Sequence, residues 1–247
     1  MIAREIYEAA EAAYDHAIEV ARLAVFDLPD PSDRYLMSYF ATAIEQTGGC
    51  LALAREGQIT SIPILARSIL EAWIDFRCLA ADPAYVDFIE AKHDKEWTKV
   101  FDAAANNNLY LAKIGAEPSV IAERDRIRRD TAARAARGVK ALRAVERFYR
   151  ANKGELYYSV YNYLCSEAHN DARALISRHI EADDNGQPRL TLYRADAPYV
   201  ETSLLQAHDV LAEMTETVCR RFNVQEPDRA RVQAAYEAAR RLVEGEA

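Results

Sequence analysis

The sequence is poor in glycine and proline and contains no long apolar run. Its 247 residues include 8 glycines and 8 prolines, too few for a disordered chain, a collagen-like chain or a turn-rich all-β fold. The longest uncharged stretches, such as Leu156–Ser166, are about half as long as a membrane-spanning helix. Charged residues near the N-terminus are unlike those of a signal peptide. We therefore expect neither membrane insertion nor secretion.

Cysteine is also scarce, and the four cysteines are far apart in the sequence. Cys50, Cys78, Cys165 and Cys219 are separated by 28, 87 and 54 residues, with no Cys-x-x-Cys pair. This spacing does not resemble a disulfide framework or a zinc site. The sequence therefore predicts reduced thiols and a cytoplasmic location.

The apolar residues recur with a helical period over almost the whole chain. We expect helices over 2–28, 32–56, 61–81, 82–114, 118–152, 155–178, 200–222 and 228–244. The one exception is a small β-hairpin expected at 179–197, because Asn185-Gly186 lies between two short alternating segments. The fold class is therefore all-α, a multi-helix bundle in a single domain over 1–247. Its core spans 32–222, and the first and last helices pack on that core.

The charge is unevenly distributed along the chain. The formal net charge is −8, yet the segment 124–153 carries nine arginines and two lysines against three acidic residues. That segment is +8 and the remainder is −16. A basic helix of this kind could bind the phosphates of RNA or of a nucleotide. It could equally pair with the acidic remainder of the protein or of a second subunit, so both partners stay open.

The segment 61–81 is apolar nearly all the way round, as is typical of a buried central helix. Arg67, Glu71 and Asp75 are spaced four residues apart on it and share one stripe. Buried charges need partners, because an uncompensated buried ion costs several kcal/mol. One interpretation is a structural Arg67–Glu71 ion pair that ties the bundle together. The other is a polar pocket between helices with these two side chains in its wall.

A second polar group lies in the tyrosine-rich segment 155–178. His169 continues a stripe with Cys165, Ala172 and Ile176, which would place it inward or at the edge of a groove. It could be a hydrogen-bonded core histidine, or an acid–base catalyst, since histidine titrates near neutral pH. The candidate catalytic residues are His169, Arg67, Glu71 and Ser166, and the candidate binding residues are Tyr161, Asn170, Arg173 and Asp75.

Evidence for a metal or cofactor is thin. Glu90 and His93 have the Glu-x-x-His spacing of di-iron bundles, but a second such motif is missing from the sequence. Phosphate-binding glycine loops and hydrolase motifs are absent as well. We expect no metal site and no cofactor.

Two separated motifs resemble a bacterial family of helical proteins of unknown function. The first is ARSILEAWIDFRCLAADP, with Arg67, Glu71 and Asp82-Pro83, and the second is YNYLCSEAHNDARAL, with Tyr161, Ser166 and His169. The resemblance implies a helical bundle and no particular activity. More distantly, the arrangement is similar to HEPN domains, helical dimers that include toxin and antiphage ribonucleases. Their catalytic histidine follows a nearby arginine, whereas residues 162–164 before His169 contain none, so Arg67 would have to act from another helix.

Two functions follow as hypotheses. One is a HEPN-like protein that acts on or binds RNA or a nucleotide in stress or phage defence, with His169 as acid–base and Arg67 on the phosphate. The other is a non-enzymatic homodimeric helical interaction module, in which Arg67, Glu71 and His169 form a buried structural network. Whether the protein is an enzyme is left open.

Overall fold

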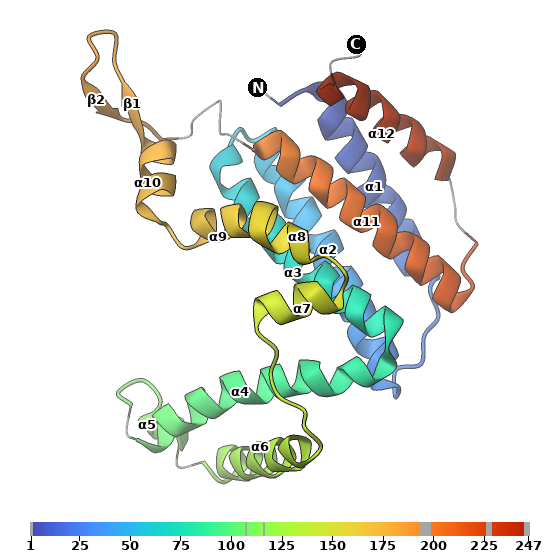
Figure 1. The fold of residues 1–247 in the computed structure, drawn as a ribbon, viewed down its shortest axis with the longest axis vertical. Coiled ribbons are helices and arrows are strands. Elements are labelled where there is room, and N and C mark those ends of the chain that lie inside the picture. Colours follow the sequence, from blue (N-terminus) through green and yellow to red (C-terminus); the bar gives the residue numbers. More distant parts are fainter. Residues whose placement is uncertain (1, 107, 116, 193–198, 226–228, 245–247) are drawn as a thin grey trace.

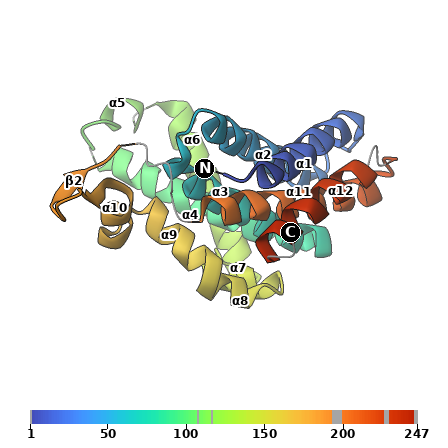
Figure 2. The same ribbon diagram turned by 90° about the horizontal axis from the view of Figure 1, so that it is seen from above.

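Helix α3 (Ile62–Ala81) lies at the centre of a helical bundle, as the sequence predicts. In the computed structural model, which describes residues 2–106, 108–115, 117–192, 199–225 and 229–244, twelve of its twenty residues are buried. Long helices on two sides of α3 cover it: α2 (Pro31–Arg55) and α11 (Val200–Phe222). Helix α1 (Arg4–Leu23) packs against both of these and against α12 (Arg229–Glu244) (Figures 1 and 2).

The remaining elements lie outside this bundle of long helices. A series of short helices crosses one side of α3, and α4 and α6 lie side by side at the lower end of the molecule in Figure 1. Their bounds are η1 Ile59–Ser61, η2 Pro83–Tyr85, α4 Val86–Ala105, α5 Ala112–Gly115, α6 Pro118–Ala136, α7 Ala144–Arg150, α8 Gly154–Leu156, the π-helical turn η3 Tyr157–Tyr161, α9 Asn162–Ala168 and α10 Ala172–His179.

A single antiparallel hairpin follows α10 and projects from the bundle (Figure 1). Strands β1 (Ile180–Ala182) and β2 (Pro188–Leu190) pair with Ile180 opposite Leu190. Gly186 takes a φ of +77° in the turn, a conformation that glycine adopts without strain. The all-α fold class with a small hairpin is therefore confirmed. Residues 193–197 of the expected hairpin lie outside the described part of the chain.

Helix ends set by a local signal agree with the expectation, with small shifts. Helices α3, α11 and α12 match their predicted spans within a residue or so. Helix α2 begins one residue before the expected cap, because Asp30 rather than Ser32 caps it: the Asp30 carboxylate accepts a hydrogen bond from the Ser32 backbone N–H at 2.8 Å. Helix α1 ends at Leu23 and not at 28.

Three long helices expected from the periodicity are broken in the structure. The basic helix 118–152 is interrupted after α6, where Gly138 has a φ of +77°. The helix 82–114 ends at Ala105, and the Asn108 side chain beyond it accepts a hydrogen bond from the Tyr110 backbone N–H at 3.0 Å. The helix 155–178 breaks between α9 and α10, where Asn170 has a φ of +54°. Asp171 then caps α10 by accepting from two backbone N–H groups. Single residues that favour a turn outweigh the helical period at these points.

Among the described residues, no helix combines the length and the apolar character needed to cross a bilayer.

Candidate functional site

The charged stripe of α3 forms a connected cluster with residues from other elements. The Arg67 and Glu71 side chains pair at 2.8 Å, and the Tyr161 hydroxyl donates to the same Glu71 carboxylate at 2.8 Å. The Arg67 guanidinium also lies 5.7 Å from the centre of the Tyr161 ring, within cation–π range. We call Arg67, Glu71, Asp75, Tyr85, Arg147 and Tyr161 the α3 cluster.

The other end of the α3 cluster is buried around Asp75. Its carboxylate accepts from Arg147 Nη1 at 2.7 Å and from the Tyr85 hydroxyl at 2.8 Å, with Lys92 Nζ at 3.6 Å. The Asp75 and Arg147 side chains are 5% and 7% exposed. Two hydrogen bonds and a nearby ammonium therefore hold the Asp75 carboxylate within this buried network.

Burial and neighbouring charge move the pKa values of Tyr161 and Arg67 further from neutral pH. Burial raises the pKa of Tyr161, and Glu71 raises it further against the lowering effect of Arg67. Burial lowers the pKa of Arg67, but its contacts with Tyr161 and Glu71 raise it by more. Both groups therefore keep their ordinary protonation states, a cation and a neutral hydroxyl. This arrangement supports a structural ion-pair network.

The four other predicted site residues lie at the turn between α9 and α10. His169 ends α9 and is exposed, while the Ser166 hydroxyl hydrogen-bonds Asp171 and thereby lowers the pKa of that carboxyl. The Asn170 side chain accepts from Arg178 at 2.8 Å, and Arg173 is exposed. These contacts belong to a turn and a helix cap.

The structure thus divides the predicted site into two groups. Within the described ranges, no hydrogen bond or ion pair links the His169 side chain to Arg67 or Glu71. The inward position expected for His169 is wrong, because the stripe on which it depended ends where α9 ends. Its role as an acid–base catalyst remains a prediction. Of the eight residues, Arg67, Glu71, Asp75 and Tyr161 come together.

The sequence reasoning missed two members of the α3 cluster, Arg147 and Tyr85. The sequence places Arg147 in the expected basic helix 118–152, with its partner left open, whereas in the structure it lies in the short helix α7 and points to α3. A signal was present: Arg147 is followed by the fully buried Phe148, and Tyr85 follows the Asp82-Pro83 cap in a short turn against α3. Neither signal identifies Asp75 as the partner.

Most arginines of the basic segment 124–153 pair with carboxylates of the protein itself. Eight of its nine arginines have an acidic partner within 4.0 Å: Arg124, Arg126, Arg128, Arg134, Arg137, Arg143, Arg147 and Arg150. Arg134 is central, because it binds Asp94 and Glu90 of α4 and so joins α6 to α4. RNA or nucleotide binding through this segment remains a prediction, with most of its cations already paired.

The one Glu-x-x-His motif does not gather further ligands. Glu90 binds Arg134, and the His93 ring lies 3.3 Å from Asp94. No group of three or more histidine, cysteine or acidic side chains is placed to hold a metal in the described portion of the structure.

Because two thiols are buried, we expect the free energy of unfolding to fall at alkaline pH. Burial raises the pKa of Cys78 to about 11 and of Cys50 to about 12, from a reference of 9.0. The unfolded thiols ionise first, so the stability present below pH 9 is lost as the pH rises toward 11. Urea denaturation should give a free energy of unfolding that is lower at about pH 10.5 than at about pH 8, by on the order of 1–2 kcal/mol per thiol. Cys78→Ala should reduce that loss, and an unchanged pH dependence in the variant would contradict the assignment.

Comparison with known proteins places the chain in a family. A search of curated proteins and a search of solved structures each found no match. The family model described as "Family of unknown function (DUF5677)" matches residues 33–188. This range contains the α3 cluster, the α4–α6 pair and strand β1, and it ends at the first residue of β2. Since the match covers more than half of the 247 residues, the protein belongs to the family of unknown function DUF5677.

Proposed function

We propose that this protein is a non-enzymatic interaction module that forms a homodimer through its projecting arm, defined as α10, β1, β2 and the two residues that follow (172–192). The observation that carries the proposal is apolar exposure on this arm. Five large apolar side chains on it are between 41% and 68% exposed: Leu175, Ile176, Ile180, Leu190 and Leu192. Apolar side chains gathered on one exposed element are typical of a protein–protein contact.

The register of the hairpin places the apolar side chains of its strands on one face. Ile180 and Leu190 are directly opposed and therefore point to the same side of the sheet. Leu192 lies two residues after Leu190, where an extended chain would return to that face. A two-stranded hairpin is marginally stable by itself in water, whereas a third or fourth strand with an apolar face stabilises it. Two arms related by a twofold axis would supply four strands, and twofold homodimers are the commonest symmetric assembly.

The base of the arm is anchored to the bundle. Arg178 of α10 binds the buried Glu167 of α9 at 3.5 Å and donates to the Asn170 side chain at 2.8 Å. Ala174 on the inner face of α10 is buried as well. An anchored arm loses less conformational freedom on association than a loose one, which favours binding. The α3 cluster has a structural role in this proposal. The four cysteines are not joined in disulfides, which fits a reducing compartment such as the cytoplasm.

Light scattering coupled to gel filtration tests the proposal. The wild-type protein should elute with twice the mass of the chain, and Ile180→Ser/Leu190→Ser should elute as a monomer with an unchanged helical circular dichroism spectrum. The matched control is Leu109→Ser, since Leu109 is 86% exposed at a site away from the arm, and this variant should remain a dimer. A monomeric wild type, or a dimer that survives the double substitution, would overturn the proposal.

The enzymatic hypothesis has a separate test. RNA cleavage by purified wild-type protein that His169→Ala abolishes would favour a HEPN-like ribonuclease over the interaction module. We expect no cleavage, because the cations near a bound phosphate would have to come from arginines that are already paired.

A further inference from the structure

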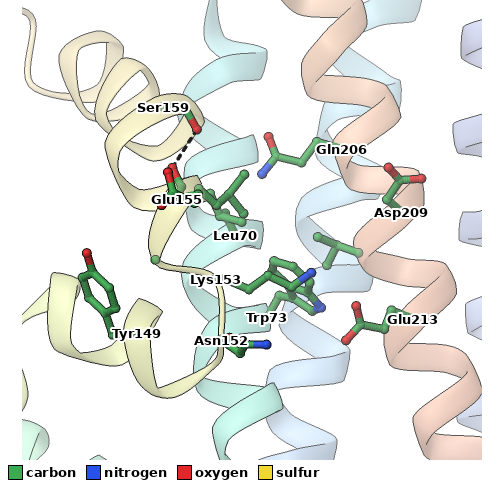
Figure 3. Close-up of a pocket in the computed structure, with 13 residues that line it drawn as sticks. Leu70, Trp73, Tyr149, Asn152, Lys153, Glu155, Ser159, Gln206, Asp209 and Glu213 are labelled. Atoms are coloured by element: carbon green, nitrogen blue, oxygen red, sulfur yellow. Dashed lines mark hydrogen bonds between the residues drawn. The ribbon is translucent and has the colours of Figure 1, made fainter.

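A cleft of about 640 Å³ lies between α3, the α7–α8 connection and α11, apart from the α3 cluster and from the arm. Figure 3 shows its polar side chains: Gln206 and Glu213 from α11 lie across the opening from Trp73 of α3 and Lys153. Asp209 of α11 also lines the cleft, but its carboxylate points away from them and contacts the His208 ring at 3.1 Å. A smaller hollow of about 320 Å³ continues from it along α9 and shares Ser159 and Gln206. The size is within the range of small-molecule sites.

Two side chains that line the cleft carry buried polar atoms without a protein partner. Both amide atoms of Gln206 and the indole Nε1 of Trp73 have no hydrogen-bond partner among the described residues. Trp73 is 94% buried, given its 6% exposure. A buried polar group without a partner is destabilising. Together they offer two kinds of donor, an amide N–H and an indole N–H, and one carbonyl acceptor beside the amide donor.

The walls next to these polar atoms suit a flat apolar molecule. Leu70 of α3, Leu156 of α8 and Val210 of α11 line the cleft. Ser159, also in the wall, belongs to the π-helical turn Tyr157–Tyr161, and single π-helical turns occur frequently at functional sites. A planar ring between aliphatic walls could place its polar edge against Gln206.

The charges around the cleft disfavour an anionic ligand. Glu155, Asp209 and Glu213 contribute three carboxylates to the lining, against the single ammonium of Lys153. Arg77, outside the cleft, pairs with Glu213. Lys153 lies over the Trp73 ring, 5.1 Å from its centre. A phosphate in this cleft would face more negative than positive charge.

We infer that this cleft binds an uncharged nucleobase or its nucleoside, with a donor and an acceptor of the base edge paired to the Gln206 amide and a second acceptor paired to Trp73 Nε1. Nucleobases combine a flat apolar face with adjacent donors and acceptors on one edge, as this lining requires. The absence of a phosphate distinguishes this ligand from a nucleotide or an RNA strand. The inference uses none of the arm residues and goes beyond the proposed homodimer.

Calorimetric titration with adenosine, guanosine, uridine, cytidine and their free bases tests the inference. At least one should bind at up to millimolar concentration, and its 5′-monophosphate should bind more weakly. Gln206→Leu should weaken binding by about tenfold or more, because it removes a donor and an acceptor while keeping similar volume. The same change should not lower the melting temperature of the free protein, since it removes unsatisfied polar atoms. Gln233→Leu on the exposed side of α12, where Gln233 contacts only Glu237 among the described contacts, should bind like wild type.

Three results would overturn the inference: no heat of binding with any base or nucleoside, binding that Gln206→Leu leaves unchanged, or tighter binding of the monophosphates. Trp73→Phe provides a second variant that removes the indole N–H donor together with part of the ring system, and unaltered affinity in it would contradict the inferred hydrogen bond to Trp73 Nε1. Light scattering on the same samples reports the oligomeric state separately, so the failure of one proposal is distinguishable from the failure of the other.

Discussion

Replacing Arg147 with alanine is expected to lower the free energy of unfolding by about 3–5 kcal/mol, the cost of leaving one ion of a buried pair uncompensated. Arg147 Nη1 donates to the Asp75 carboxylate at 2.7 Å, and both side chains are less than a tenth exposed. In the variant, Asp75 would retain only the Tyr85 hydroxyl at 2.8 Å and the more distant Lys92. Urea denaturation followed by circular dichroism measures the loss.

Arg126→Ala is the matched control for this prediction. Arg126 pairs with Glu123 at 2.5 Å and Asp130 at 2.7 Å, but all three side chains are exposed. Exposed pairs contribute about 0–1 kcal/mol, so the control should lose far less stability. Arg147→Met/Asp75→Leu should regain much of the loss, because removing both charges leaves no unpaired ion. Similar small losses in Arg147→Ala and Arg126→Ala would show that the α3 cluster does not stabilise the fold. If Arg147→Ala does not fold, the double variant still supplies the comparison.

The second large effect is expected at Arg134, where the loss should be local. Arg134 of α6 is 10% exposed and binds Asp94 of α4, which is 3% exposed, together with Glu90. Helices α4 and α6 lie side by side at one end of the molecule (Figure 1). Arg134→Ala leaves Asp94 buried with a Thr131 hydroxyl at 3.5 Å and His93 at 3.3 Å. The free energy needed to separate α6 from α4 should then fall by about 3 kcal/mol. The backbone amides of α6 should accordingly exchange roughly a hundredfold faster.

Hydrogen exchange of the backbone amides measures this opening segment by segment. Exchange should accelerate across residues 118–136 and change little in α3 and α11. Arg137→Ala serves as the control, since Arg137 at the end of α6 contacts Asp87 of α4 at 2.9 Å but is 58% exposed. It should leave the exchange of α6 near the wild-type rate. Uniform acceleration over the whole chain, or equal effects of the two substitutions, would contradict a local role for Arg134.

The site was only partly predictable because its contacts join distant parts of the chain. The Arg67–Glu71 pair follows from a spacing of four residues on one helix. The hydrogen bond from Tyr161 to Glu71 spans 90 residues, and the one from Arg147 to Asp75 spans 72. A helical period tells which residues share a face, but not which other helix meets that face. Half of the predicted site residues accordingly lie outside the α3 cluster, at the turn between α9 and α10.

The sequence alone determined the helical class, the central apolar helix α3 and the hairpin at Asn185-Gly186, because these depend on period, burial and turn chemistry within a few residues. It also showed a +8 segment within an otherwise acidic chain and left open which partner that segment binds. Only the tertiary structure decided where helices break, which carboxylates the arginines bind, and that Gln206 and Trp73 face one cleft. The physical reason is that burial and pairing of a charge depend on the helix packed against it, and that neighbour is often far away in the sequence.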